Sequence, residues 1–346
     1  IKIGTSFSNL SFSAFSGTQL TMSASGLGDA LIQFASATVA KMEDKAKFIT
    51  TDKTFYVQAA NAATTFTAAS ASAAEYIRQY NATAGSSTFA SGGRGDTLIG
   101  GGGSDTFNYN KDIAVINGGA GNDWVKLTSG TNQTLDLTSA QFTSIEIASA
   151  TGLTGGQTLR GATTADTLIG GAGADAIWSR GSNDEVRGGA GADTFWFAAG
   201  DGVDTIDDLN KTGLTKDTVK FASLNQSDLS FTWDSTNNAI VTTYGATGSD
   251  IVFMTAPSGL FNVQTADKTF GLLAGSYNYA AATTRTGTTG ADYIRNFYTA
   301  DVTGSTMTIN GGGGADTIIG GSGKENIAFN STLAYVDGGA GVDTLG

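Results

Sequence analysis

The chain has 346 residues, an apolar content of 40% and a formal charge of −12, and it contains neither cysteine nor histidine. This composition excludes disulfides, thiol nucleophiles, imidazole bases and the usual zinc sites. The acidity disfavours nucleic-acid binding, which needs clustered Lys and Arg, and favours cations as partners. No apolar run is long enough to span a membrane, and because the chain starts at Ile1 we expect a processed protein or a piece of a longer one.

The region before the glycine-rich part of the chain is predicted to mix strands and helices. Residues 1–25 alternate apolar and small polar side chains, as in LSFSAFSG, which favours short strands. Over residues 27–48 the apolar spacing changes to that of one helical face, and a second helix is predicted over residues 68–80. We interpret both as packing helices of a small subdomain rather than as partner-binding helices.

Beyond Ser91 the chain contains three glycine-rich blocks with a period of nine residues. Each unit has a glycine-bearing turn that ends in an acid, and an apolar residue follows two positions later. The acids are Asp96, Asp105 and Asp123 in block one, Asp166, Asp175, Asp184 and Asp193 in block two, and Asp316, Glu325 and Asp343 in block three. One unit of block one and one of block three have lost the acid, to Ala114 and Ala334. These two blocks align without a gap at an offset of 220 residues, which indicates an internal duplication.

The repeat has a physical logic that predicts metal ligands. Glycines permit the positive φ angles of a tight turn in which carbonyl oxygens converge, and the closing acid adds a carboxylate. Oxygen ligands in a loose geometry suit Ca²⁺ better than Mg²⁺. The apolar residue after each acid is expected to point inward between two parallel sheets. These inward residues are Leu98, Phe107, Ile116 and Val125, then Leu168, Ile177, Val186 and Phe195, then Ile318, Ile327, Val336 and Leu345.

Two segments between the blocks are predicted to be rich in strands. Residues 125–150 include LDLTSAQFTSIEIAS, which alternates apolar and polar side chains. Residues 229–254 predict a hairpin or a three-stranded meander, with DSTNN and GATGSD as its turns. The chain should therefore be mainly β beyond its first part.

The motifs resemble those of a known family. GGAGADTFW and GGAGNDWVK match the GGxGxDxUx repeat of RTX (repeats-in-toxin) proteins. The segment FAAGDGVDTIDDLNKTGLTKDTVKFASL resembles the stretch that follows such repeats, and DLSFTWDSTNNAIVTTYGATGSDIVF is similar to the module often appended after it. The resemblance covers residues 91–346. It implies several short right-handed parallel β-rolls that bind calcium, with meander or sandwich-like segments between them. Together with the small helical N-terminal part predicted above from the apolar spacing, the expected fold class is mainly β.

The repeat blocks, the segments between them and the region before them predict a domain organisation. We predict a mixed β and helical region at 1–90, β-roll one at 91–127, a β linker at 128–159, β-roll two with its capping segment at 160–222, a strand-rich module at 223–285 and β-roll three at 286–346.

In such a roll each unit is half a coil, so turns eighteen residues apart share an edge and hold calcium between them. The implied acid pairs are Asp166 with Asp184, Asp175 with Asp193, and Asp105 with Asp123. The family pattern adds backbone carbonyls at the first and third turn positions, which here are Gly100, Gly102, Gly118, Ala120, Gly170, Ala172, Gly188 and Ala190. Several calcium ions are therefore expected, and without them the rolls should be disordered, since stacked acidic turns repel one another.

Further ligand positions are less complete. They are Asp96, Asp204, Asp316, Glu325 and Asp343. Asp96 would face Ala114 and Asp316 would face Ala334, so one edge of blocks one and three should bind calcium poorly. The longer side chain of Glu325 would displace its carboxylate from Asp343. Block two alone keeps both edges, and we expect it to bind calcium most tightly and to unfold last under chelation.

Three classes of function remain open. We favour a non-enzymatic structural protein of the bacterial cell surface, an S-layer or extracellular filament subunit that associates with itself into a sheet or filament, with cell-surface polysaccharide as a further partner. An Ala, Gly, Ser, Thr and Asn bias, a single proline and the RTX-like phrase FTSIEIAS favour it. The alternatives are an RTX adhesin or toxin-type binding module, and the calcium-binding C-terminal part of a secreted protease, lipase or epimerase. No catalytic motif was found, so we expect no enzyme.

The family further implies type I secretion and an extracellular location. Gly346 falls at the ninth position of a repeat, which predicts an exposed roll end. Truncation is the simpler interpretation of that end, and capping by a neighbouring subunit is the alternative.

Overall fold

The structure is a computed structural model, and its secondary structure is almost entirely β. It describes residues 10–16, 19–24, 28–33, 46–49, 54–60, 65–67, 74–79, 85–91, 95–207, 217–234, 236, 239–245, 250–255, 259–274, 284–296, 306–328 and 332–346. Within these ranges the one helical segment is the 3₁₀ turn η2 (Gln226–Asp228), and no helix is long and apolar enough to cross a membrane.

The strands are short, and most have three to seven residues. Up to residue 150 they are β1 (Leu10–Ser16), β2 (Gln19–Ala24), β3 (Gly28–Gln33), β4 (Ala46–Ile49), β5 (Thr54–Ala60), β6 (Thr65–Thr67), β7 (Ala74–Gln79), β8 (Thr88–Ala90), β9 (Thr97–Ile99), β10 (Thr106–Tyr109), β11 (Val115–Asn117), β12 (Trp124–Leu127), β13 (Thr134–Asp136), β14 (Phe142–Thr143) and β15 (Ile147–Ser149).

The later strands are equally short. They are β16 (Thr158–Arg160), β17 (Thr167–Ile169), β18 (Ala176–Trp178), β19 (Glu185–Arg187), β20 (Thr194–Phe197), β21 (Val203–Ile206), β22 (Thr218–Phe221), β23 (Ser230–Asp234), β24 (Ala239–Tyr244), β25 (Asp250–Thr255), β26 (Gly259–Gln264), β27 (Thr269–Ala274), β28 (Thr284–Thr286), β29 (Tyr293–Arg295), β30 (Thr306–Asn310), β31 (Thr317–Ile319), β32 (Lys324–Ala328), β33 (Tyr335–Asp337) and β34 (Thr344–Leu345).

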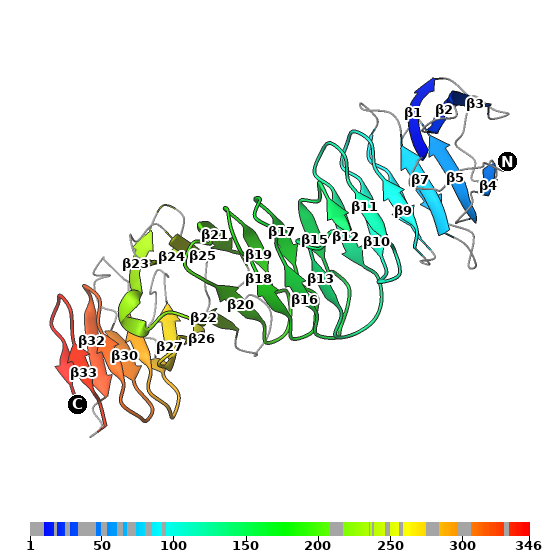
Figure 1. The fold of residues 1–346 in the computed structure, drawn as a ribbon. Helices are drawn as coiled ribbons and strands as arrows, with labels where there is room; N and C mark the ends of the chain where they lie inside the picture. The colour runs from blue at the N-terminus through cyan, green and yellow to red at the C-terminus, as the bar shows by residue number, and fades with distance from the viewer. Residues whose placement is uncertain are drawn as a thin grey trace. The chain divides into compact units, whose positions relative to one another are not determined.

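The chain forms two compact units, residues 1–130 with 135–150 and residues 131–134 with 151–346. In the first unit, strands β15, β12, β10, β8 and β6 form one sheet in that order, and β14, β11, β9, β7, β5 and β4 form another (Figure 1). From β6 to β12 successive strands alternate between the two sheets and pair in parallel with the strand two places on. Each nine-residue unit is therefore half a coil, as predicted. Strands β1, β2 and β3 form a separate antiparallel sheet.

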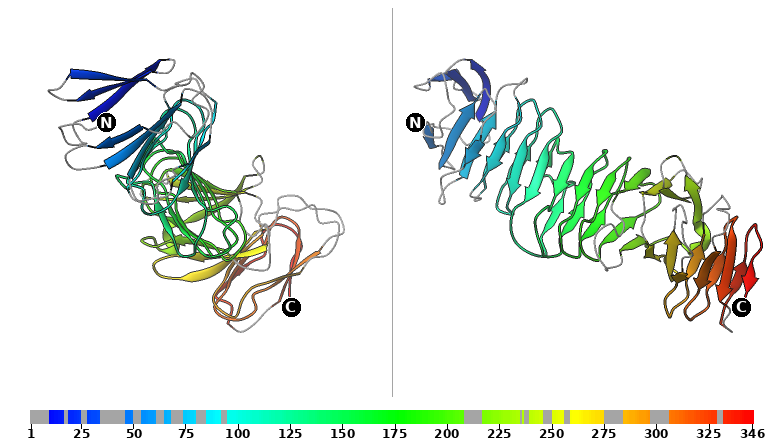
Figure 2. Two further views of the ribbon diagram at one scale, coloured as in Figure 1. Left: turned by 90° about the vertical axis from the view of Figure 1, so that its right-hand side faces the viewer. Right: turned by 180° about the vertical axis from the view of Figure 1, so that it is seen from behind.

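The second unit repeats this architecture. One sheet runs β16, β18, β20, β22, β26, β27, β29, β31 and β33, so it passes through the second repeat block, the strand-rich module and the third block. Its partners are β17, β19 and β21 on one stretch and β28, β30, β32 and β34 on another. Figure 2 shows the same stacks of coils from behind and from the side. The predicted fold class, a mainly β protein of parallel coils, is confirmed.

The two predicted helices are wrong wherever the structure describes them. Within 27–48 the described residues are strands β3 and β4, and within 68–80 they are strand β7; the rest of both ranges lies outside the described residues. Ile77 of β7 pairs with Leu98 and is fully buried, so Ile77 occupies an inward position of a coil. Short apolar runs are ambiguous between helix and strand, and pairing with β5 and β9 decided the outcome.

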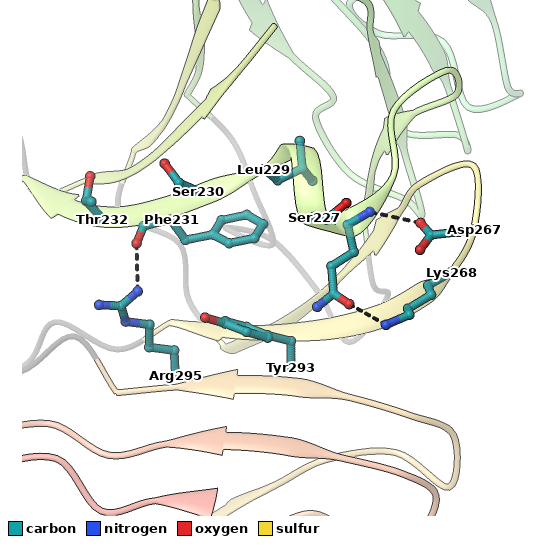
Figure 3. Close-up of a pocket in the computed structure, with 10 residues that line it drawn as sticks. Ser227, Leu229, Ser230, Phe231, Thr232, Asp267, Lys268, Tyr293 and Arg295 are labelled. Carbon is teal, nitrogen blue, oxygen red and sulfur yellow. Dashed lines mark hydrogen bonds between the residues drawn. The ribbon is translucent and has the colours of Figure 1, made fainter. Parts of the chain in front are cut away.

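The meander predicted over 229–254 is confirmed. Strand β23 pairs antiparallel with β24, and β24 pairs antiparallel with β25. Beside β23, η2, the turn at residues 265–268 and strand β29 line a pocket (Figure 3). Strand β25 then pairs in parallel with β21, which attaches the meander to the coils of the second block.

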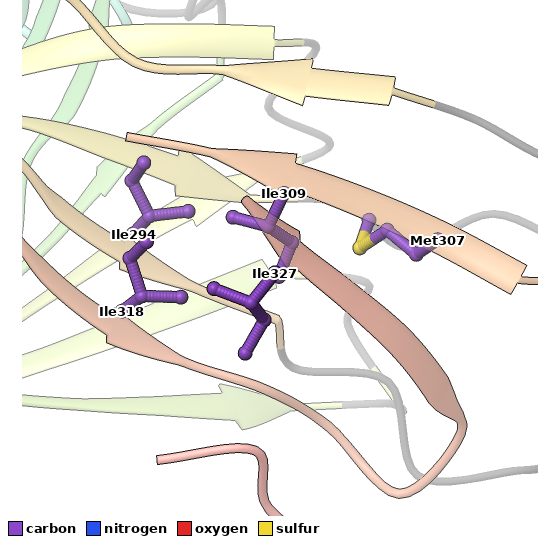
Figure 4. Packing of buried hydrophobic residues seen from close by; sticks show 5 residues of the cluster. All are labelled: Ile294, Met307, Ile309, Ile318 and Ile327. Atoms are coloured by element: carbon purple, nitrogen blue, oxygen red, sulfur yellow. The ribbon is translucent and has the colours of Figure 1, made fainter. Parts of the chain in front are cut away.

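The core is the row of inward residues between the two faces of each coil. In and beside the third block a cluster of buried side chains packs together (Figure 4): Ile294, Met307, Ile309, Ile318 and Ile327. Val336 packs against this cluster. Of the twelve predicted inward residues, ten are buried and Val336 is half-buried. Leu345 is 56% exposed, which contradicts the prediction, because β34 is an edge strand with β32 on one side only.

Candidate metal centres along the turn edges

The repeat turns crowd oxygen atoms into a small space. A Cβ on Gly170, the first residue of its turn, would lie 2.2 Å from the carbonyl oxygen of Gly188 and 2.5 Å from Oδ2 of Asp175. Gly100 repeats this relation with the Gly118 oxygen and Asp105 Oδ2, at 2.0 and 2.5 Å. Only glycine fits at these positions. Because it has no side chain, the carbonyl oxygen of the next stacked turn lies near the carboxylate that closes the glycine's own turn.

The structure brings together every acid pair that the sequence predicted. The N–H of Asp166 donates to Oδ1 of Asp184 at 2.8 Å. Asp175 and Asp193 are joined in the same way at 2.8 Å, and Asp105 and Asp123 at 2.7 Å. All six carboxylates are buried. The useful spacing is thus eighteen residues, and the acids form ladders along the edges of the coils.

Three of the ladder carboxylates also close their own turns. Oδ2 of Asp175 accepts the N–H of Gly171 at 2.5 Å, Oδ2 of Asp105 accepts that of Gly101 at 3.0 Å, and Oδ2 of Asp166 accepts that of Ala162 at 2.6 Å. One carboxylate therefore fixes the turn to which it belongs and the turn of the preceding coil. This explains why the short aspartate, rather than glutamate, dominates the repeat.

The predicted carbonyl positions lie in stacked turns. Ala190 N–H donates to the Gly171 oxygen at 3.0 Å, and Ala172 N–H to the Leu153 oxygen at 2.6 Å. In the first unit, Gly102 and Ala120 form an isolated parallel bridge. A Cβ at any of the first positions would collide with Oδ2 of the acid that closes the same turn; these positions are Gly100, Gly118, Gly170 and Gly188. Their role as ligands stays a prediction.

Burial makes the ionised form of these acids unfavourable. Burial, with the charges of Asp204, Asp166 and Asp201, raises the pKa of Asp184 to about 8. Burial also raises the pKa of Asp204 to about 7. It raises the pKa of Asp123 to about 6, and the charges of Asp105 and Glu146 add to this increase. Buried like charges without a counter-charge favour protonation, so a cation would relieve the repulsion.

The residues fit calcium on two observations. Four buried carboxylate oxygens accept no hydrogen bond among the described residues: Asp123 Oδ2, Asp184 Oδ2, Asp316 Oδ2 and Glu325 Oε2. No three acidic side chains in the described part of the chain gather closely enough to hold a metal alone, so backbone carbonyls have to complete the shell. Carboxylate and carbonyl oxygens in an irregular cradle are the donor set of Ca²⁺.

The incomplete edges hold more acid than the sequence indicated. Ala114 and Ala334 do lie next to Asp96 and Asp316, to whose carbonyl oxygens they each donate at 2.9 Å. On the other side, however, Oδ1 of Asp96 accepts the N–H of Glu75 at 2.7 Å. The prediction paired Asp96 only with the unit that follows it. Its other partner, Glu75, precedes the glycine-rich blocks and was therefore not considered.

Asp316 has a second acidic neighbour of the same kind. Its Oδ1 accepts the N–H of Asp292 at 3.0 Å, across 24 residues instead of eighteen. Asp292 is 3% exposed, and its Oδ2 accepts the N–H of Thr288 at 2.5 Å, as a repeat acid does. The motif GTTGADYIR, with threonine at the second glycine position, is the signal that would have found it.

The three remaining weaker positions, Glu325, Asp343 and Asp204, also join ladders. Glu325 donates its N–H to Oδ1 of Asp343 at 3.0 Å, and its own Oε1 accepts Asn296 Nδ2 at 2.7 Å. Oδ1 of Asp204 accepts the N–H of Asp184 at 3.0 Å, and its Oδ2 accepts Ser179 Oγ at 3.0 Å. The Asp166 edge therefore continues to a third acid.

Sequence reasoning missed other acids in equivalent places. Oδ1 of Asp217 accepts the N–H of Asp193 at 3.0 Å, and Oε2 of Glu146 accepts that of Asp123 at 2.8 Å. Asp250 ends the motif GATGSD, which was predicted as a turn of the meander, and its Oδ2 also accepts the N–H of Gly200 at 2.9 Å. A Cβ on Gly245 would lie 2.3 Å from that oxygen, the relation found in the repeat turns.

One turn carries backbone strain. In several turns the second and fourth positions are glycines with positive φ, as at Gly189 and Gly191, where φ is 93° and 125°. In the turn of residues 179–184 these positions are Arg180 and Ser182, with φ of 68° and 89°. A side chain at such an angle is disfavoured, so this turn is held by the coils around it.

Comparison with known families agrees with the geometry. The model of the RTX calcium-binding nonapeptide repeat (4 copies) matches residues 81–112, 115–133, 151–186, 160–195, 180–206 and 308–328. No curated protein matches the chain. Asp217, Asp250 and Asp292 lie outside the matched residues, although their carboxylates accept the hydrogen bonds described above.

Proposed function

Because this chain is an RTX-type protein, whose repeats imply a calcium-binding, secreted protein, we propose that it is a non-enzymatic structural protein of the bacterial cell surface. It would serve as an S-layer or extracellular filament subunit that folds and assembles on binding Ca²⁺. The ladder of buried carboxylates is the observation that carries this proposal.

Each ladder couples metal binding to folding. The oxygens of Asp123 and Asp184 that accept no hydrogen bond are buried only when the coils are stacked, so a cation between the turns binds the folded chain and not the unfolded one. Preferential binding to the folded state stabilises it by mass action. The bound ion supplies positive charge to the edge, while the residues supply a preformed set of oxygens.

A stripe on one face of the second unit supports self-association. Arg160, Trp178, Trp196 and Lys220 lie side by side on successive strands. The indole rings stack at 4.9 Å, the Arg160 guanidinium lies 4.8 Å from the centre of the Trp178 ring, and Lys220 Nζ lies 4.0 Å from that of Trp196. Aromatic rings and arginine are enriched at protein–protein interfaces, so this stripe is suited to contact with a second copy.

Electron microscopy of the purified protein with and without millimolar calcium tests the proposal. Regular sheets or fibres in calcium, lost in chelator, are expected. The double variant Trp178→Ser with Trp196→Ser should bind calcium normally and fail to assemble. Arg187→Ser, a cation on the other face of the same coils, is the control and should assemble. Dispersed monomers of the unaltered protein in calcium would contradict the structural role and favour a binding module.

A further inference from the structure

The second unit contains a pocket that the calcium ladders do not use. Its volume is about 580 Å³, within the range of roughly 300–1,000 Å³ common for ligand sites. It lies between η2, strand β23, the turn at residues 265–268 and strand β29. Figure 3 shows the rings of Phe231 and Tyr293 across the middle of the pocket, with Arg295 at one end and Lys268 at the other.

The aromatic wall is rigid. Phe231 and Tyr293 have ring centroids 5.8 Å apart, and both pack against buried Phe270, at 6.2 and 6.0 Å. Phe231 is buried behind this wall, while Tyr293 is half-buried and presents ring surface to the pocket. The wall therefore needs no rearrangement to receive a flat apolar face.

The polar ends of the pocket are fixed by hydrogen bonds. Arg295 NH1 donates to the Phe231 carbonyl oxygen at 2.8 Å. At the other end, Lys268 Nζ donates to Oε1 of Gln226 at 2.8 Å, and the Gln226 N–H donates to Oδ1 of Asp267 at 2.8 Å. These side chains are held in place before any ligand arrives.

The lining selects a class of ligand. Two cations and one carboxylate give it a net positive charge in a chain of charge −12, so it favours an anionic group. The hydroxyls of Ser227 and Thr232 add hydrogen-bonding groups, which disfavours a lipid tail. A ring with one apolar face, several hydroxyls and one carboxylate matches the wall, the polar rim and the cations together.

We propose that this pocket binds the uronic acid residues of an acidic polysaccharide, with the sugar ring on Tyr293 and the carboxylate on Arg295 or Lys268. The inference rests on the proposed function in one respect only, namely that the chain would meet the polysaccharide at the cell surface. Binding in solution therefore tests it separately from assembly.

A matched pair of small glycosides tests the proposal in calcium buffer: methyl glucuronide and methyl glucoside, which differ only in the carboxylate. Titration followed by NMR should give the glucuronide a dissociation constant at least about five times lower, because a charge-assisted hydrogen bond is stronger than a neutral one. Tyr293→Ala should abolish binding of both sugars. Lys268→Met should reduce the preference for the acid without loss of the fold.

The control variant is Lys126→Met, which removes a cation on strand β12, outside the pocket, and should bind the glucuronide as the unaltered protein does. Equal binding of the two glycosides would overturn the acidic class of ligand. Glucuronide binding that survives Tyr293→Ala, in a variant whose circular dichroism is unchanged, would overturn the assignment to this pocket.

Discussion

The backbone N–H of Asp166 donates to Oδ1 of Asp184, eighteen residues further along the chain, at 2.8 Å. Oδ2 of the same Asp184 is buried and accepts no hydrogen bond among the described residues. One carboxylate thus has a structural oxygen, which ties two coils together, and an oxygen left for a cation. The behaviour of the roll follows from this division.

Asp184→Asn separates the two roles of the carboxylate. The amide oxygen can still accept the Asp166 N–H, but the charge that attracts calcium is lost. We expect the calcium concentration at the folding midpoint to rise by roughly tenfold, since hydrogen bonds and contacts to charged groups contribute about 1.5–3 kcal/mol. Calcium titration followed by circular dichroism measures it. Asp112→Asn, at an exposed acid paired with Lys111, is the control and should leave the midpoint unchanged.

The stability of the calcium-free roll should fall as pH rises. Burial raises the pKa of Asp184 to about 8 and that of Asp204 to about 7, from an ordinary value of 3.8. The folded state therefore holds protons that the unfolded state has released, so these groups stabilise the fold below about pH 4 and lose that contribution as pH rises to about 8. In chelator, strand content should be higher at pH 5 than at pH 8. Equal spectra at the two values would contradict the raised pKa values.

The strained turn offers a stabilising substitution. Ser182 has φ of 89° at a position where other turns have glycine, so Ser182→Gly should raise stability in calcium by about 0.5–1 kcal/mol despite the added freedom of the unfolded chain. Ser179→Gly is the matched control in the same turn. It removes the hydrogen bond from Ser179 Oγ to Asp204 and should be destabilising. Thermal unfolding of both variants in calcium decides between strain relief and a general effect of glycine.

The ladder in the third block can be lengthened or shortened by one acid. Ala334 is exposed and donates its N–H to the Asp316 carbonyl oxygen, so Ala334→Asp should add a ligand and raise the number of calcium ions bound. Ala334→Asn has the same shape without the charge and should bind the same number as the unaltered protein. Asp292→Asn should lower the number by one, although Asp292 lies outside the family match. Isothermal titration counts the ions, and an unchanged count in Asp292→Asn would remove it from the ladder.

The sequence predicted the repeat region well because its period is enforced by packing. An inward apolar residue at every ninth position, such as Phe107 or Ile177, has no alternative place in a thin coil. The acid pairs followed from the same period. Asp292 and Asp217 were not predicted as ladder acids because 24 residues, not eighteen, separate each from the acid to which it is hydrogen-bonded. A fixed period of nine cannot follow an interval of 24 residues.

The N-terminal prediction failed for a different reason. Ile77 and Tyr76 lie in a segment whose apolar spacing also fits a helix, and nothing local distinguishes the two structures. Pairing of β7 with β5 and β9, at separations of 19 and 21 residues, makes the segment a strand. The expectation that block two binds calcium most tightly stays a prediction, since blocks one and three hold the additional acids Glu75 and Asp292 on their edges.

The central claim is that calcium drives formation of the coils. Far-UV circular dichroism during a calcium titration at pH 8, starting from chelator, tests it most directly. The buried carboxylates predict a largely disordered spectrum in chelator and a cooperative gain of β signal as calcium is added. A fully formed β spectrum in chelator at this pH, unchanged by calcium, would contradict the account.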